Sequence, residues 1–226
     1  MLEKLPAAVG HFLQGQRAGL DALAFYQVDI RPGQGMLKIE SLAFVDHGPI
    51  PTRYTTDGEG VSPPIFWKGV PEKATSLVLI VEDADSPTPN PLVHAIVVNI
   101  DCATSSFAEG ALDSPDHEGT ADADTGRNSY LQARWLPPDP PPGHGVHRYA
   151  FQVFALVDSL DESPRFEGSP GRDEVMEAIQ ERAIASGCLV STYERKDPTE
   201  EVPFARATAV EEGTPAALLP KPLIPT

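Results

Sequence analysis

Short apolar runs separated by turns rich in proline and glycine dominate the chain from residue 36 onward. The clearest runs cover residues 76–83, 93–100 and 148–157. In the last run Phe151 falls on one face and Phe154 on the other, and the positions two residues away from each are also largely apolar. A strand that is apolar on both faces belongs in the middle of a sandwich, covered on two sides. The pattern therefore predicts a mainly β fold with peripheral helices.

In two other stretches the apolar residues recur with a spacing near 3.6 residues. Apolar residues from Leu2 to Leu20 predict an amphipathic helix that begins close to Met1. We expect it to pack on the surface of its own domain, with a dimer contact as the alternative. Residues 173–187 are the clearest internal helix, with Gly187 as its C-terminal stop, and 188–195 are predicted to form a final strand.

These patterns divide the chain into three parts. We expect an N-terminal helical extension over 1–35, one domain over 36–196, and a proline-rich, extended or disordered tail over 197–226. Within the domain, residues 102–145 have no sustained period. A loop of this length in a compact domain is usually functional or disordered, and we expect it to drape over one end of the sandwich.

Composition and charge exclude several classes of function. With 33 Asp and Glu against 17 Lys and Arg, the formal net charge of −16 would repel phosphate backbones, so we expect no nucleic-acid partner. Two cysteines, Cys102 and Cys188, can build neither a disulfide framework nor a four-cysteine zinc site. Charges and Pro6 interrupt the N-terminal apolar residues, so we expect no signal peptide, no membrane span and a cytoplasmic protein. No cofactor is indicated.

The candidate chemistry begins at the break between two apolar runs, "VEDADSPTPNPLVHAIVVNI" at 81–100. Asp83 and Asp85 are two positions apart at the end of a strand, so in a regular strand both carboxylates would project to one face at the rim of the sheet. Pro87 and the prolines that follow stiffen the turn. His94 opens the next run and can both donate and accept hydrogen bonds when neutral.

A second junction of this kind lies at 140–151, "PPPGHGVHRYAF". Here a rigid proline run and two glycines deliver His147, Arg148 and Tyr149 to the start of a buried strand. Each histidine taken alone is more often a satisfied core residue, but two such junctions in one domain favour a shared pocket. His144 and His147 with the aspartates could also suggest a metal site, but a loop broken by glycine rarely holds such a pair, so we expect no bound metal.

Four motifs in register give these residues a context. "DGEGVSPPIFWKGVP" at 57–71, "DADSP" at 83–87, the histidine that opens a strand ending in "NI", and "GVHRY" at 145–149 occur in the order found in phosphatidylethanolamine-binding proteins. Over roughly residues 38–195 the chain resembles this family, also called Raf kinase inhibitor-like proteins, and in particular its bacterial YbhB/YbcL branch.

The resemblance implies a β-sandwich of two antiparallel sheets with a C-terminal helix and a small anion pocket at one end. The pocket residues that it carries onto this chain are Asp83, Asp85, Pro87, His94, His147 and Tyr149, with Arg148, Pro137 and Trp67 in support. It further implies that Arg148 pairs with one of the aspartates. A phosphate monoester or a phosphoethanolamine headgroup would then accept hydrogen bonds from the histidines, while an ammonium group could meet a carboxylate.

Two departures from the family pattern affect the pocket. Pro137 stands where the family has glycine, which removes a backbone N–H that could cradle an anion. His94 is flanked by Val93 and Ala95 instead of an aromatic residue, which predicts that it lacks an aromatic wall.

Three functions follow as hypotheses. The first is a non-enzymatic protein that binds a small anionic or phosphorylated ligand, with a protein kinase or protease as the partner it modulates. The second is a hydrolase that uses Asp83 with His94 or His147 as an acid–base pair; without a G-x-S-x-G nucleophile pattern, water would be its nucleophile. The third is a homodimeric interaction protein with a vestigial pocket.

Overall fold

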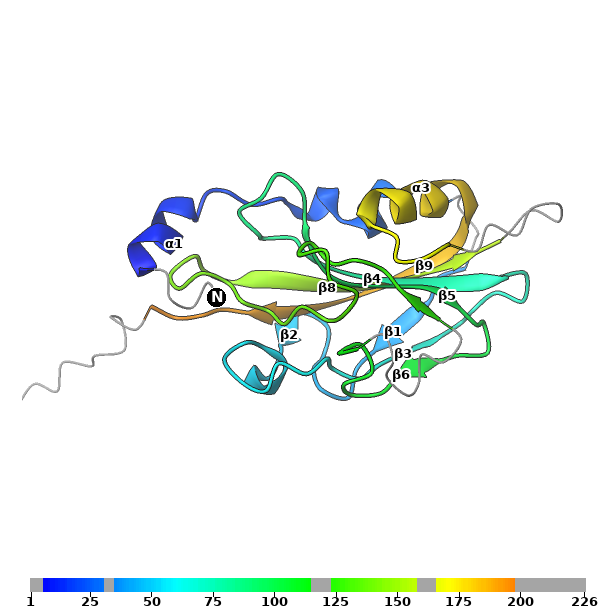
Figure 1. Ribbon diagram of the computed structural model, residues 1–226, viewed down its shortest axis with the longest axis horizontal. Helices are drawn as coiled ribbons and strands as arrows, with labels where there is room; N and C mark the ends of the chain where they lie inside the picture. The colour runs from blue at the N-terminus through cyan, green and yellow to red at the C-terminus, as the bar shows by residue number, and fades with distance from the viewer. Residues whose placement is uncertain (1–5, 31–34, 115–122, 158–165, 198–226) are drawn as a thin grey trace, which may run out of the picture.

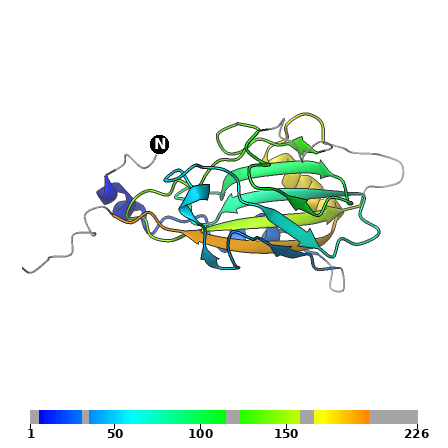
Figure 2. The same ribbon diagram turned by 90° about the horizontal axis from the view of Figure 1, so that it is seen from below.

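A wide β-sheet forms the middle layer of the protein, with helices on one face and a small second sheet on the other (Figure 1). The computed structural model describes residues 6–30, 35–114, 123–157 and 166–197. In these ranges the large sheet has six strands in the order β2-β9-β8-β4-β5-β7, and the small sheet has three in the order β1-β3-β6. The strands run along the long axis of the molecule (Figure 2). The predicted mainly β sandwich is confirmed.

The bounds of the strands follow the apolar runs closely. They are β1 (Lys38–Glu40), β2 (Gly48–Pro49), β3 (Ile65–Lys68), β4 (Ser76–Asp83), β5 (Leu92–Ile100), β6 (Ser106–Phe107), β7 (Asp124–Thr125), β8 (His147–Leu156) and β9 (Ala183–Tyr193). All of the strand pairs within the two sheets are antiparallel except β2 with β9. Strand β8 lies between β4 and β9, and both of its faces are covered: Phe151 packs in the cluster shared with the small sheet and Phe154 in the cluster shared with the helix at 172–182.

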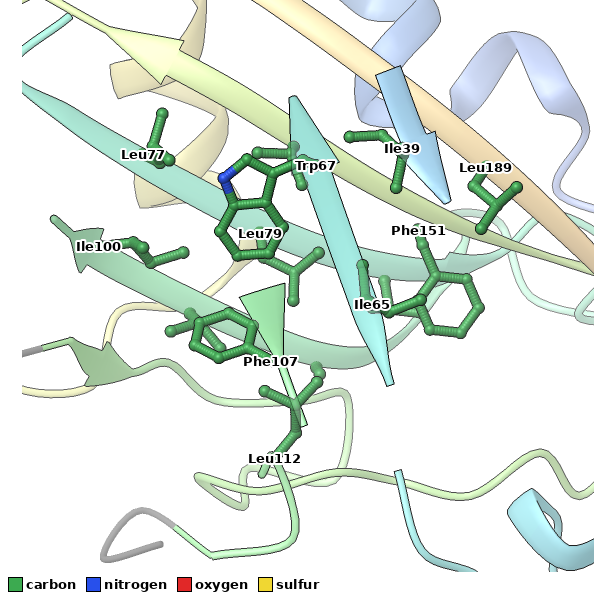
Figure 3. Close-up of a cluster of buried hydrophobic side chains, with 14 of the residues drawn as sticks. Ile39, Ile65, Trp67, Leu77, Leu79, Ile100, Phe107, Leu112, Phe151 and Leu189 are labelled. Atoms are coloured by element: carbon green, nitrogen blue, oxygen red, sulfur yellow. The ribbon is translucent and has the colours of Figure 1, made fainter. Parts of the chain in front are cut away.

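The main core lies between the two sheets. Trp67 and Ile65 from the small sheet pack toward Leu79 and Phe151 of the large sheet, and all of them are buried (Figure 3). Further members of this cluster come from β1, β5, β6 and β9. Alternation along each strand places these side chains inward, and their burial is the main source of stability.

Helix α3 (Arg172–Arg182) covers the opposite face of the large sheet (Figure 1). Val175 and Ile179 of this helix are fully buried in a second cluster with Phe154 of β8. The prediction that the helix continues to Gly187 is wrong, because residues 183–187 belong to β9 and pair with β8. Gly187 lies so close to the backbone of Leu37 that a Cβ would overlap the Leu37 carbonyl oxygen.

The N-terminal segment is also less helical than predicted. Its helices are α1 (Ala7–Leu13), the 3-10 turn η2 (Leu20–Ala22) and α2 (Ala24–Gln27); a further 3-10 turn, η3, spans Thr52–Tyr54. Leu23 and Ala24 are fully buried against the large sheet, so this stretch packs on its own domain. The predicted start near Met1 and the tail from 198 onward lie outside the described residues.

None of the helices in the described ranges has the length and apolar character needed to cross a bilayer.

Candidate functional site

Antiparallel pairing of β4 with β8 brings the two candidate junctions together. The register places Asp83, the last residue of β4, opposite Tyr149 near the start of β8. On its other side β4 pairs with β5, with Asp83 opposite Leu92, two positions before His94. The turn at 84–91 and the loop before β8 therefore meet at the same end of the sheet.

A pocket of about 380 Å³ opens at this end of the sheet. It is lined by Thr56, Asp83, Ser86, Pro87, Thr88, Leu92, His94, Tyr130, Leu136, Pro137, Asp139, Pro140, Pro141 and His147. The lining combines a few polar side chains with several apolar ones, among them four prolines. A mainly apolar wall with a few polar groups is typical of a small-molecule site.

A chain of hydrogen bonds connects the floor of the pocket with the N-terminal segment. His147 Nδ1 lies 2.7 Å from Asp83 Oδ2, and His147 Nε2 lies 2.6 Å from His144 Nδ1. His144 Nε2 in turn lies 2.8 Å from the carbonyl oxygen of Leu13. Asp83 and both histidines are buried, with exposed fractions of 4% or less. Because each nitrogen of His147 already has a partner, this ring cannot offer a ligand an uncommitted hydrogen bond.

Counting protons gives the net charge of this hydrogen-bonded cluster. Each of its three hydrogen bonds needs one proton, and the two imidazoles and the carboxylate share those three protons with zero net charge. Burial lowers the pKa of His144, and the positive charge of His147 lowers it further. With His144 neutral and donating through Nε2 to Leu13, the geometry leaves His147 to donate through Nε2 to His144 and through Nδ1 to Asp83.

His94 presents a different hydrogen-bonding state to the pocket. Its Nδ1 lies 2.5 Å from the carbonyl oxygen of Leu136, so Nδ1 carries the proton and donates it. Burial lowers the pKa of His94, which keeps the ring neutral. The remaining nitrogen, Nε2, is buried and has no hydrogen-bond partner in the part of the chain that the structure describes; it is an acceptor in this tautomer.

The His94 ring has aromatic neighbours, contrary to the prediction from Val93 and Ala95. The ring centroid of Tyr149 lies 5.1 Å from that of His94 in an edge-on arrangement, and the centroid of Trp135 lies 5.9 Å away. Residues from β8 and from the loop at 126–146 thus replace the aromatic neighbour that β5 lacks. They hold the ring of His94 in place.

Asp85 lies outside the pocket, although it is only two residues after Asp83. Its fully buried carboxylate accepts two hydrogen bonds of 2.7 Å from the Arg148 guanidinium and one of 2.9 Å from the Arg148 backbone N–H. Arg17 adds an ion pair of 2.8 Å. Burial by itself would raise the pKa of Asp85, but the bonds to Arg148 and Arg17 lower it overall. This network anchors the turn and the N-terminal segment.

The structure therefore separates the predicted site residues into two groups. Those that line the pocket are Asp83, Pro87, His94, Pro137 and His147. Those that do not line it are Asp85, Arg148, Tyr149 and Trp67. Tyr149 is fully buried beside both histidine rings, and Trp67 packs in the main core against Phe107.

Sequence reasoning did not select two residues that the geometry makes prominent. His144 contacts His147 directly, and its i, i+3 spacing was the available signal. Asp139 lines the pocket from the proline run and pairs with Arg195 at 2.7 Å. Nothing local in the sequence indicates that second pairing, because the partners are 56 positions apart.

The pocket is close to electrically neutral. No lysine or arginine is among its described lining residues, while Asp83 and Asp139 each have a cationic partner in His147 and Arg195. The described part of the chain also contains no group of three or more His, Cys, Asp or Glu residues placed to hold a metal ion. Recognition here therefore depends on hydrogen bonding more than on net positive charge.

Residues 40–194 match the sequence profile of the phosphatidylethanolamine-binding protein family. This match covers more than half of the chain, and the chain belongs to that family. The resemblance inferred from these motifs is thereby confirmed.

Relatives and solved structures agree with this assignment. A UPF0098 protein of Methanothermobacter thermautotrophicus is 35% identical over 162 residues, which are 70% of this chain and 99% of the relative. The crystal structure of a phosphatidylethanolamine-binding protein homologue from Chlamydia trachomatis is 35% identical with a TM-score of 0.60, and covers 71% of this chain and 98% of its own. YbcL of Escherichia coli, described as a member of the mammalian family, is 26% identical with a TM-score of 0.63, and covers 70% and 98% of the two chains.

Proposed function

We propose that this protein is a non-enzymatic binding protein that holds one small phosphorylated or anionic group in the pocket of Asp83, His94 and His147. The observation that supports it is the buried Nε2 of His94, a residue that lines the pocket; among the described residues this nitrogen has no hydrogen-bond partner. Buried polar atoms are nearly always hydrogen-bonded, so an unpaired one beside a pocket favours a bound partner.

The hydrogen-bonding states of the pocket indicate which form of the ligand fits. The neutral His94 ring accepts at Nε2, so the ligand must supply a hydrogen-bond donor there. A phosphate monoester has a second pKa near 6, and only its singly charged form keeps a P–OH group. The ammonium group of phosphoethanolamine is an alternative donor, and the carboxylates of Asp83 and Asp139 in the lining would favour it.

The same geometry argues against His147 as the general base of a hydrolase. A general base must have a free lone pair within reach of the proton that it removes. His147 has Asp83 on one nitrogen and His144 on the other, so it would have to break a buried hydrogen bond before it could act. Modulation of a kinase or protease and formation of a homodimer remain predictions from the resemblance and from the amphipathic N-terminal segment.

Isothermal titration calorimetry at pH 5.5 and 7.5 with inorganic phosphate, phosphoethanolamine and a nucleotide would test this proposal. We expect saturable binding by the full chain, with the nucleotide, which is a phosphate monoester, bound more tightly at pH 5.5 than at pH 7.5. His94→Phe removes the acceptor but keeps a flat ring, and we expect it to weaken binding about 10-fold or more. His147→Ala, which removes the partner of Asp83, is expected to abolish binding.

The matched control is His47→Asn, which changes an exposed histidine outside the pocket at a position whose φ of 58° suits asparagine. Circular dichroism and thermal melting would establish that each variant is folded. Equal affinity of His94→Phe and the parent protein for the same probe would refute the pocket assignment.

A further inference from the structure

The N-terminal segment lies directly on the loop that carries His144. Figures 1 and 2 place α1 at one end of the molecule, beside the turn that leads into β8. The Gln14 side-chain amide donates to the Gly143 carbonyl at 2.7 Å, and the Arg17 guanidinium donates to the carbonyls of Val146 and His144 at 2.8 and 3.0 Å. The segment therefore holds this loop by its backbone.

One contact of this segment reaches the pocket itself. The carbonyl oxygen of Leu13, at the end of α1, accepts from His144 Nε2 and so fixes which nitrogen of that ring carries the proton. With Nε2 protonated and the ring neutral, Nδ1 is the acceptor for His147 Nε2. His147 can then keep both protons and pair with Asp83 in the pocket.

This arrangement adds to the family domain. The family match begins at residue 40, and the relatives described above align with about 70% of this chain. The contacts of Leu13, Gln14 and Arg17 come from outside the matched residues, yet one of them, from the Leu13 carbonyl, ends on the His144 ring beside a pocket histidine. A segment that only shielded the surface would not need to fix a buried imidazole.

We propose that His144 is a positioning residue through which α1 controls the protonation of the Asp83–His147 pair, and through it the ligand affinity of the pocket. The link to affinity rests on the proposed binding function. Docking of α1 and occupation of the pocket are then coupled, and the coupling is reciprocal: a bound ligand holds α1 on the loop as strongly as α1 favours the ligand.

Gly10 offers a way to disturb α1 without touching the pocket. A Cβ at this position would overlap the carbonyl oxygen of Pro142 and lie 2.9 Å from the His144 backbone nitrogen. Alanine also favours a helix more than glycine does, so Gly10→Ala should displace α1 from the loop without unfolding it. Gly15→Ala is the matched control, because a Cβ there would have no atom within 4 Å.

The first measurement needs no ligand. Long-range ¹H–¹⁵N NMR of the histidine rings reports which nitrogens are protonated. In the full chain we expect His144 to be the neutral tautomer protonated at Nε2 and His147 to carry protons on both nitrogens. Gly10→Ala should shift the ring nitrogens of both histidines, and Gly15→Ala should leave them unchanged. Identical His147 ring shifts in Gly10→Ala and the parent protein would overturn the proposal.

The second measurement tests the route to the pocket. Titration with phosphoethanolamine, or with inorganic phosphate, should show about 5-fold or greater weakening in Gly10→Ala, which is at the lower end of typical coupling between sites. In a His144→Ala background the same substitution should have no further effect, because the link is already broken. Additive effects of the two substitutions would refute His144 as the route.

The two proposals fail differently. If neither probe binds to any of these proteins while the His147 ring still responds to Gly10→Ala, the binding function is wrong and the link from α1 to His147 stands. If the probes bind equally to the parent protein and Gly10→Ala, the pocket is a binding site that α1 does not control.

Discussion

The buried carboxylate of Asp85 gives the sharpest test of how the N-terminal segment and the pocket turn are held. Asp85→Asn keeps the size of the side chain but removes its charge and turns one oxygen into a donor. That donor would face the guanidinium groups of Arg17 and Arg148, which are themselves donors only. The substitution thus breaks two ion pairs at once and leaves two cations without a carboxylate.

The expected cost can be derived from the burial of the three groups. Removal of one partner from a buried ion pair costs about 3–5 kcal/mol. Asp85 is fully buried, but the side chains of Arg17 and Arg148 are 30% and 34% exposed, so water compensates part of the loss. We therefore expect the free energy of unfolding to fall by about 3 kcal/mol, and the melting temperature to fall by about 6–12 °C for a chain of this size.

The pH dependence provides a second check on the same network. The folded pKa of Asp85 is lowered relative to about 3.9 in the unfolded chain. Its stabilising contribution is therefore complete above about pH 5 and is lost as the pH falls through the folded pKa. The difference in stability between the parent protein and Asp85→Asn should be largest at neutral pH and shrink toward zero in acid.

Urea unfolding followed by circular dichroism at pH 7, 4 and 3 would measure these differences. Glu59→Gln is the control, because its ion pair with Arg53 is exposed to water and should contribute little to stability. A loss below about 0.5 kcal/mol for Asp85→Asn would contradict the buried-network reasoning, since that is the range of an ordinary surface substitution. A difference that does not change with pH would contradict the assignment of the pKa.

Two further predictions concern β9. Gly187→Ala should destabilise the protein by about 1–3 kcal/mol in the same urea assay, because a Cβ would overlap the Leu37 carbonyl. The control Gly35→Ala should have little effect, because the nearest atom to a Cβ there is 3.5 Å away. Equal stabilities of the two variants would show that β9 and the segment before β1 are less closely packed than described. Burial raises the pKa of the Cys188 thiol to about 12. Iodoacetamide at pH 8 should therefore leave Cys188 unmodified in the native protein and modify it in urea, which mass spectrometry would detect. Rapid labelling of Cys188 in the native protein would refute this prediction.

The strands could be predicted from sequence with good accuracy because burial on two faces leaves a clear signal. The runs at 76–83 and 93–100 are observed as Ser76–Asp83 and Leu92–Ile100. The end of α3 could not be predicted, since residues 183–187 fit a helical stripe as well as a strand. These residues form a strand because they pair with β8, with Ala185 opposite Ala155 and Gly187 opposite Val153. No local sequence pattern indicates that pairing.

The pocket-lining residues could be predicted in part, because their positions between turns and strands are visible in the sequence. Asp83, His94 and His147 stand at junctions between turns and strands, where a rigid sheet fixes polar side chains at its edge. Asp83 faces the pocket, whereas Asp85 faces two arginines. This difference arises because the regular alternation of side chains ends with β4. The role of His144 was hidden because its ring is fixed by the carbonyl of Leu13, 131 positions away.

The prolines that line the pocket have a consequence for how fast and how reproducibly a ligand could bind. Pro87, Pro137, Pro140 and Pro141 are all among the lining residues, and each has its φ angle locked by its ring. A wall of this kind has few alternative shapes, so the empty and the occupied protein should differ little there. Association should then follow simple one-step kinetics, with a rate proportional to ligand concentration and no slow phase from loop rearrangement.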